Sequence, residues 1–345
     1  MVGAVIASYA IAQLILRAPL GVWADFLGRR KLFVTAGLLF ASVGAMAMGL
    51  APGPWYLFAG RTLTGVAATT WVVSSVIFVS YFPPHRAARA IGYVSFINST
   101  AIVAATLVGG QLAEALGTRS VFFVGAILGI IGVLVLVPVA EPASVRAERS
   151  TQRLKETVRK VAGHPLVIIS SIMSALVHFG GAATISSFTL VYAKRIGASS
   201  GDLGLLSAGN LGASTVTTLL AVYLVESRGY RVTILVGALV MGAALAAMPS
   251  IDELGLFGAA QVMSGAGRGL VNTALMALSI SSLAPAHRAT AMGFYQAVYS
   301  AGMLAGPLVG GLVADSHGLA IVFYMSAASV LLAGGLTFSP TLARR

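Results

Sequence analysis

Apolar stretches of about 20 residues recur along this sequence and are separated by short polar links. As an α-helix, a stretch of that length crosses a hydrocarbon core of about 30 Å, and a helix satisfies its backbone hydrogen bonds within one segment. Only 9% of the residues are charged, and the mean hydropathy is +0.91. A water-soluble domain of 345 residues with this composition would expose a very large apolar surface. The sequence therefore predicts an all-α integral membrane protein.

The apolar stretches predict eleven membrane-spanning helices. They lie near residues 2–22, 32–50, 55–82, 90–113, 120–138, 166–193, 203–225, 232–248, 254–283, 290–313 and 319–338. Every second link is rich in Arg and Lys, whereas the opposite links contain only Arg119, Lys194 and Arg195. By the positive-inside rule, the basic links and the C-terminus face the cytoplasm of a bacterial cell. The net charge of +12 then reflects membrane topology, and a lipid bilayer rather than a nucleic acid is the expected partner.

An internal repeat relates the two parts of the chain. The link "PPHRAARAIGY" at 83–93 resembles "PAHRATAMGF" at 285–294, and an offset of 201 also pairs Gly92 with Gly293 and Phe122 with Phe323. The span at 166–193 has no counterpart, because its equivalent would precede Met1. We therefore expect 11 of 12 helices from a parent of six plus six, with the first helix lacking. A genuine eleven-helix protein is the alternative.

The repeat also predicts the domain organisation. A first transmembrane bundle is expected over 1–139, a cytoplasmic basic linker over 140–163 and a second bundle over 164–345. The linker contains the amphipathic stretch "SVRAERSTQRLKETVRK". Two helical halves joined by a basic cytoplasmic link are the plan of a known class of transporters.

The stretch "GVWADFLGRRK" at 21–31 resembles the signature loop G-x-x-x-D-R-x-G-R-R of the major facilitator superfamily, with Phe26 in place of the usual base. "RTLTG" at 61–65 resembles the fourth-helix motif of that family. "GMLAGPLVGG" at 302–311 fits the pattern of its antiporters, but that pattern belongs on the fifth helix, where this chain reads "AIVAATLVGG". The resemblance covers the whole chain and implies a secondary transporter whose two pseudo-symmetric bundles rock around a midplane site.

The resemblance also implies a conformational latch. Asp25 is expected to accept hydrogen bonds from the N-terminal N–H groups of the helix that starts near Ala289, which closes the cytoplasmic side. Gly28 would permit a tight turn, and Arg29 and Arg30 would anchor the loop to headgroups or carboxylates. Membrane topology alone is the alternative reading of Arg30 and Lys31. The predicted gating residues are Gly21, Asp25, Gly28, Arg29, Arg30, their counterparts Glu226, Gly229 and Arg231, and Gly302, Gly306 and Pro307.

Polar residues inside the spans predict the substrate site. The spans at 32–50, 120–138, 232–248 and 319–338 have no charged residue and no Asn, Gln or His, so they are expected outside the cavity. Arg268 lies midway along its span, at a cost of at least roughly 2.5–3.5 kcal/mol, which favours substrate or ion contact over a structural contact with carbonyls. Arg17 lies within two turns of a span end, close enough to snorkel, so a structural role is favoured over a functional one. The predicted substrate-binding residues are Arg61, Asn98, His178, Asn210, Arg268, Asn272, Tyr295 and Tyr299.

The chemistry of the spans limits the function. All ten acidic residues lie at span ends or in links, so a neutral or anionic organic solute fits better than a polycation. Coupling to protons would depend on His178 or on a group of the absent helix. The chain has no cysteine, scattered histidines and no P-loop, so we expect no enzyme, metal site or cofactor. We expect a monomeric secondary transporter with proton-coupled efflux as one mode. An uptake permease of the same fold and a truncated inactive or sensor protein are the alternatives.

Overall fold

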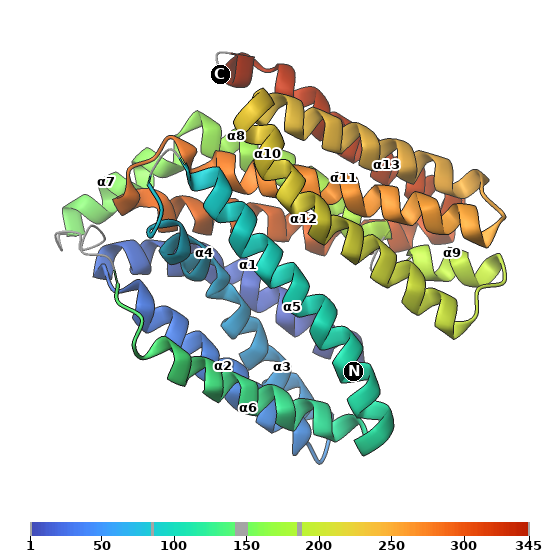
Figure 1. Cartoon of the computed structure of the whole chain (residues 1–345), viewed down its shortest axis with the longest axis horizontal. Coiled ribbons are helices and arrows are strands. Elements are labelled where there is room, and N and C mark those ends of the chain that lie inside the picture. The colour runs from blue at the N-terminus through green and yellow to red at the C-terminus, as the bar shows by residue number, and fades with distance from the viewer. Residues whose placement is uncertain (1, 84–85, 142–150, 185–187, 344–345) are drawn as a thin grey trace. The chain divides into compact units, whose positions relative to one another are not determined.

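The structure, a computed structural model, describes residues 2–83, 86–141, 151–184 and 188–343, and this part of the chain is helical without strands (Figure 1). The helices are α1 (Val2–Leu27), α2 (Arg30–Gly49), α3 (Pro54–Thr69), α4 (Trp71–Val79), α5 (Ala87–Leu116), α6 (Thr118–Leu136), α7 (Thr151–Ala162), α8 (Pro165–Ala183), α9 (Thr189–Arg195), α10 (Ser200–Ala247), α11 (Leu254–Ser281), α12 (Arg288–His317), α13 (Leu319–Gly335) and α14 (Pro340–Ala343), with short 3₁₀ turns at Met248–Ser250, Pro285–His287 and Leu336–Phe338.

Most predicted spans coincide with a helix or with part of one, whereas the span at 166–193 covers both α8 and α9. The span at 55–82 is divided into α3 and α4 at Thr70, and α10 covers both 203–225 and 232–248. By length and apolar composition, eight helical stretches of the described residues could cross a membrane. Of the expected amphipathic stretch in the linker, α7 is described and residues 142–150 lie outside the described part of the chain.

The 201-residue repeat is visible in the backbone. Gly28 and Gly229 have φ angles of 58° and 82°, and each follows an apolar span at a basic link. Gly117 and Gly318 form a second pair at the same offset, with φ angles of 84° and 87°. Positive φ is costly for residues with a Cβ, so glycine is required at these turns. The two halves of the sequence therefore turn at equivalent positions.

The first compact unit comprises Met1–Pro84, Ala104–Gly163 and Leu283–Ala297. Within it α2 packs against α3 and α6, and α1 packs against α3 and α4. The approach of α2 to α3 is close, because a Cβ on Gly44 would lie 2.7 Å from the carbonyl oxygen of Gly60. Figure 1 shows α2, α3 and α6 side by side.

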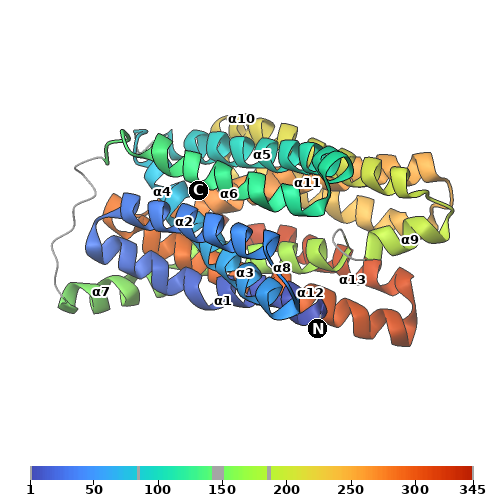
Figure 2. The same ribbon diagram turned by 90° about the horizontal axis from the view of Figure 1, so that it is seen from below.

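The second compact unit comprises His85–Val103, His164–Ser282 and Val298–Arg345. Here α10 packs along α11 and against α13, and α8 packs against α11 and α13; Figure 2 shows α10 beside α11. Two of the divisions between the units, at 103/104 and 297/298, fall within α5 and within α12. Each unit therefore includes a helical segment from the other half of the sequence.

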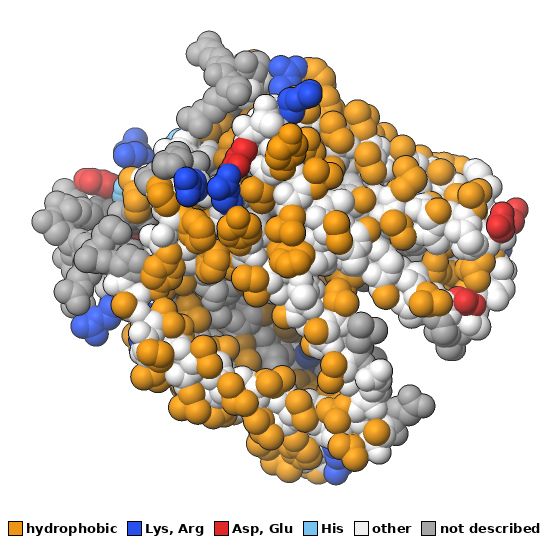
Figure 3. Space-filling view, viewed as in Figure 1, with side chains coloured by type: hydrophobic (Ala, Val, Ile, Leu, Met, Phe, Trp, Pro, Cys, Tyr) orange, Lys and Arg blue, Asp and Glu red, His pale blue; other side chains and the backbone are white. Residues whose placement is uncertain are grey.

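The outward helix faces are apolar. On α6 only Ala126 is buried, while Ile127, Leu134 and Val135 are each more than half exposed. On the face shown in Figure 3, apolar side chains cover most of the helices and most charged side chains lie near helix ends. Exposed apolar faces of this extent suit a bilayer, where lipid chains replace water.

Candidate functional site

A buried ionic cluster joins the end of α1 to the start of α12. One oxygen of the Asp25 carboxylate accepts hydrogen bonds from the backbone N–H and the hydroxyl of Thr290, at 2.6 and 2.7 Å. The other oxygen pairs with the Arg30 guanidinium at 2.7 Å. Thr290 lies in the first turn of α12, so the carboxylate sits at the positive end of that helix. The structure therefore contains the contact that the signature loop implies.

Arg30 is an internal residue of this cluster. It is 1% exposed, and the nitrogen that pairs with Asp25 also donates to the carbonyl of Pro285 at 2.8 Å. Its backbone N–H donates to the carboxylate of Glu141 at 2.6 Å. The reading of Arg30 as a topology marker alone is therefore wrong, whereas Arg29 is exposed as a surface base would be.

The same loop fixes the chain that follows α6. Lys31 donates to the carbonyls of Val137 and Val139 at 2.7 and 2.8 Å, and the Tyr81 hydroxyl donates to the carbonyl of Ala140. Lys31 thus has a structural contact in addition to its role in topology.

Glycines bring α1 and α12 into backbone contact. A Cβ on Gly21 would overlap the carbonyl of Ala289, and one on Gly293 would lie 2.6 Å from the carbonyl oxygen of Arg17. The Arg17 side chain is 5% exposed and donates to the carbonyl of Gln296 at 3.4 Å. Arg17 therefore does not snorkel, and its guanidinium has the structural role expected of it, because it bonds to α12 inside the unit.

The second unit contains the counterpart of the Asp25 cluster. Glu226 accepts two hydrogen bonds from Arg89 of α5, at 2.6 and 3.1 Å, and both side chains are more than one-third exposed. Arg89 and Thr290 are themselves 201 residues apart. Arg231, the equivalent of Arg30, instead lies over the Phe338 ring, 4.5 Å from its centroid. The acidic residue therefore makes a contact at the equivalent position in both halves, but its partner is a threonine at the start of α12 and an arginine at the start of α5.

The motif glycines of α12 pack it against α8. A Cβ on Gly302 would overlap the Ala175 backbone, and one on Gly306 would overlap the Phe179 carbonyl. Gly311, by contrast, faces open space, and Pro307 lies inside α12. The structure therefore gives Gly302 and Gly306 a role in helix packing.

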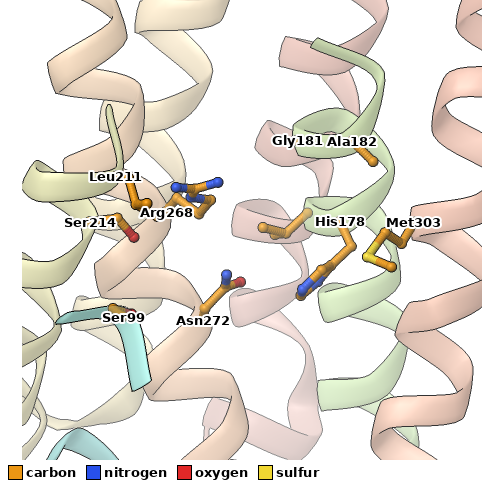
Figure 4. Close-up of a pocket in the computed structure, with 10 residues that line it drawn as sticks. Ser99, His178, Gly181, Ala182, Leu211, Ser214, Arg268, Asn272 and Met303 are labelled. Atoms are coloured by element: carbon orange, nitrogen blue, oxygen red, sulfur yellow. The ribbon is translucent and has the colours of Figure 1, made fainter. Parts of the chain in front are cut away.

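A cavity of about 230 Å³ lies within the second unit (Figure 4). Its lining residues are Ser99, Val177, His178, Gly181, Ala182, Leu211, Ser214, Arg268, Asn272 and Met303. They come from α5, α8, α10, α11 and α12, so every long helix of the unit except α13 contributes. Three predicted substrate-binding residues, His178, Arg268 and Asn272, meet here.

Arg268 is the cation of this cavity. Its half-buried guanidinium makes no hydrogen bond or ion pair with any described residue. One turn further along α11, the Asn272 Oδ1 atom is buried and has no hydrogen-bond partner in the described part of the chain. The alternative reading of Arg268, a structural contact with backbone carbonyls, is therefore not supported by any hydrogen bond among the described residues.

His178 presents a fixed imidazole to the cavity. Its Nδ1 lies 2.9 Å from the carbonyl oxygen of Ser174, so Nδ1 carries the proton of this hydrogen bond in the neutral ring. The Tyr299 ring stacks on the imidazole with centroids 4.2 Å apart and an interplanar angle of 12°. Tyr299 is not among the lining residues but supports one of them.

The other predicted substrate-binding residues lie elsewhere. Asn210 is buried and donates to the Gln261 carbonyl at 2.8 Å, so it ties α10 to α11. Asn98 is exposed and does not line the cavity, although its neighbour Ser99 does. In the first unit, Arg61 lies over the Tyr9 ring at 4.4 Å, and Tyr295 is 2% exposed.

Sequence reasoning missed several partners in these sites. Thr290 and Arg89 follow the two repeated links, and the offset of 201 that relates them was the available signal. Leu211, Ala182 and Met303 line the cavity but are ordinary apolar residues of a membrane helix, so no sequence signal distinguishes them.

Known proteins resemble this chain over its length. A sequence model of the Major Facilitator Superfamily matches residues 1–192 and 170–343. Multidrug resistance protein 1 of Bacillus subtilis is 27% identical over 63% of this chain and 55% of its own length. The multi-drug resistance efflux pump PmrA of Streptococcus pneumoniae is 26% identical over 95% of this chain and 83% of its own. The crystal structure of the Escherichia coli fucose:proton symporter FucP (N162A) superposes with a TM-score of 0.82 at 14% identity, covering 98% and 90% of the two chains.

Proposed function

Because the chain belongs to the major facilitator superfamily, whose members are secondary transporters and not enzymes, we propose that it exports a small organic anion by alternating access. The protein is a multi-pass membrane protein that binds a small-molecule substrate. The unpartnered Arg268 guanidinium in the cavity of the second unit is the observation that carries the choice of an anion.

Arg268 has no counter-charge among the lining residues of the cavity. An unpaired arginine near the middle of a membrane span costs at least roughly 2.5–3.5 kcal/mol. No acidic residue lines the cavity. An anionic solute would supply the absent counter-charge, whereas a cationic solute would meet repulsion.

Export is the direction that the relatives favour. The names of two relatives, a multidrug resistance protein and an efflux pump, support efflux. The second candidate is uptake by the same fold, favoured by the lack of the antiporter pattern on α5, where Ala101 and Ala105 replace glycines. The His178 imidazole is the titratable base in the cavity and our candidate for a coupled proton.

The Asp25 cluster is our candidate for the cytoplasmic latch. The two short hydrogen bonds from Thr290 to the Asp25 carboxylate would hold the start of α12 against α1 while the cytoplasmic side is closed, and Arg30 would hold the carboxylate in place. Separation of α12 from α1 would break both bonds from Thr290. The Glu226–Arg89 pair would act in the same way between α10 and α5.

The proposal for this protein includes its membrane topology, its domain arrangement and its oligomeric state. We propose eleven membrane spans, bundles over 1–139 and 164–345 with a cytoplasmic linker over 140–163, a cytoplasmic C-terminus and a monomeric working unit. The basic links support this orientation.

The test is transport by purified protein in proteoliposomes, with counterflow of a panel of small organic anions and cations. Arg268→Gln should reduce anion transport at least tenfold, while Arg268→Lys keeps the charge and should retain part of it. Arg119→Gln, which removes an exposed base, is the matched control. Anion transport that survives Arg268→Gln, or transport restricted to cations, would refute the proposal.

A further inference from the structure

The cavity of the second unit has two chemically different walls. In Figure 4, Arg268 lies with Leu211 and Ser214 on one side, and His178 lies with Met303 on the other. One wall therefore offers a positive charge and the other a flat aromatic ring. We infer that this site selects planar aromatic monocarboxylates, with the carboxylate on Arg268 and the ring against the His178 imidazole. The inference rests on the proposed function and specifies its substrate class.

The charge of the site fits one carboxylate. Arg268 is the single charged residue among the lining residues that the structure describes. A guanidinium donates two parallel hydrogen bonds to a carboxylate, a geometry that a spherical anion such as chloride does not match. A dicarboxylate would leave its second charge without compensation in a buried site. Monoanions are therefore favoured.

The imidazole is held as a flat surface before any ligand arrives. The hydrogen bond from Nδ1 to the Ser174 carbonyl fixes the ring at its edge, and Tyr299 covers one face at a centroid distance of 4.2 Å. A ring that is already immobile loses little conformational entropy when a ligand stacks on it. The Met303 thioether on the same wall adds a sulfur contact that aromatic ligands favour.

The remaining lining limits size and adds a polar preference. Val177, Gly181 and Ala182 are small apolar residues, and 230 Å³ is below the roughly 300–1,000 Å³ of pockets for drug-sized ligands. A single ring is therefore the expected scale. The buried Asn272 Oδ1 atom lacks a donor among the described residues, so a hydroxyl group on the ring would satisfy it.

The experiment measures binding of three matched probes to the purified full chain by isothermal titration calorimetry. Benzoate has the ring and the charge, cyclohexanecarboxylate keeps the charge without aromaticity, and benzamide keeps the ring without charge. Benzoate should bind roughly two- to tenfold more tightly than cyclohexanecarboxylate and at least thirtyfold more tightly than benzamide.

Variants assign each preference to its residue. Arg268→Gln should abolish the preference for benzoate over benzamide. His178→Leu should abolish the preference for benzoate over cyclohexanecarboxylate, whereas His178→Phe, which keeps a ring, should retain it. Arg119→Gln should leave both preferences unchanged and serves as the control.

The outcomes separate this inference from the proposed function. Equal binding of benzoate and cyclohexanecarboxylate, with both dependent on Arg268, overturns the aromatic selectivity and leaves anion transport standing. An aromatic preference that persists in His178→Leu overturns the assignment of the ring site. If none of the carboxylates binds while anions of other chemistry are transported, the substrate class is wrong and the transporter proposal is kept.

Discussion

Asp25 brings together a backbone N–H, a hydroxyl and a guanidinium around one carboxylate. Its three bonds, from Thr290 and Arg30, are 2.6 to 2.7 Å long and shielded from water. Arg30 is 1% exposed, and the Asp25 carboxylate compensates the charge of its buried guanidinium. Loss of the carboxylate charge therefore affects two residues and the start of α12 together.

Asp25→Asn is expected to destabilise the protein by about 3 kcal/mol or more, because it leaves the Arg30 charge buried without its partner. Thermal unfolding followed by tryptophan fluorescence should show a lower midpoint, and transport should fall severalfold while the protein still reaches the membrane. The exposed Arg29→Gln is the matched control and should change neither quantity. An unchanged midpoint and unchanged transport in Asp25→Asn would refute the latch.

The sequence predicted the contact of Asp25 because a signature loop and a helix N-terminus are both readable along the chain. The burial of Arg30 was not readable, because it depends on the carbonyl of Pro285, 255 residues away. In the same way, Arg268 and Asn210 are both polar residues inside spans, yet only Arg268 lines the cavity. Whether such a residue faces the cavity or a neighbouring helix depends on the rotation of its helix about the helix axis, and the local sequence pattern does not specify that rotation.

At the scale of elements, α10 combines two predicted spans. Gly229 has non-helical backbone angles, φ 82° and ψ 171°, so α10 consists of two helical segments joined at a kink between the two apolar stretches. The hydropathy pattern located both stretches, since each is long enough to span a bilayer. The break at Gly229 falls between the two predicted spans, as expected of a glycine at a helix end.

Gly229→Ala is expected to destabilise the protein by about 1–2 kcal/mol, since a Cβ is unfavourable at positive φ. Gly212→Ala is the control in the same helix, because its Cβ would enter open space. There, alanine should leave the unfolding midpoint unchanged or raise it, since it favours helix over glycine. Equal midpoints for the two variants would show that the kink at Gly229 carries no strain.

At the scale of the whole molecule, the repeat has produced two ion pairs of unequal exposure. Asp25 and Arg30 are almost completely buried, whereas Glu226 and Arg89 are more than one-third exposed. Salt screens exposed charges strongly and buried pairs much less. The two contacts should therefore respond differently to ionic strength, although they occupy equivalent positions in the sequence.

Glu226→Gln is expected to slow transport at low ionic strength by a smaller factor than Asp25→Asn, and the difference from wild type should vanish near 1 M KCl. The effect of Asp25→Asn should persist there. The double variant Arg89→Glu with Glu226→Arg restores an opposite-charge pair and should recover wild-type rates. Equal salt dependence of the two single variants would contradict two latches of different burial.

The unpartnered guanidinium of Arg268 also has an electrical consequence. In the proposed cycle the empty carrier moves a fixed positive charge when it reorients, and the anion-loaded carrier moves none. A membrane potential of 100 mV, negative inside, acts on one elementary charge with about 2.3 kcal/mol, which favours return of the empty site to the cytoplasm. Anion export would then draw its driving force from the membrane voltage through a residue of the protein itself.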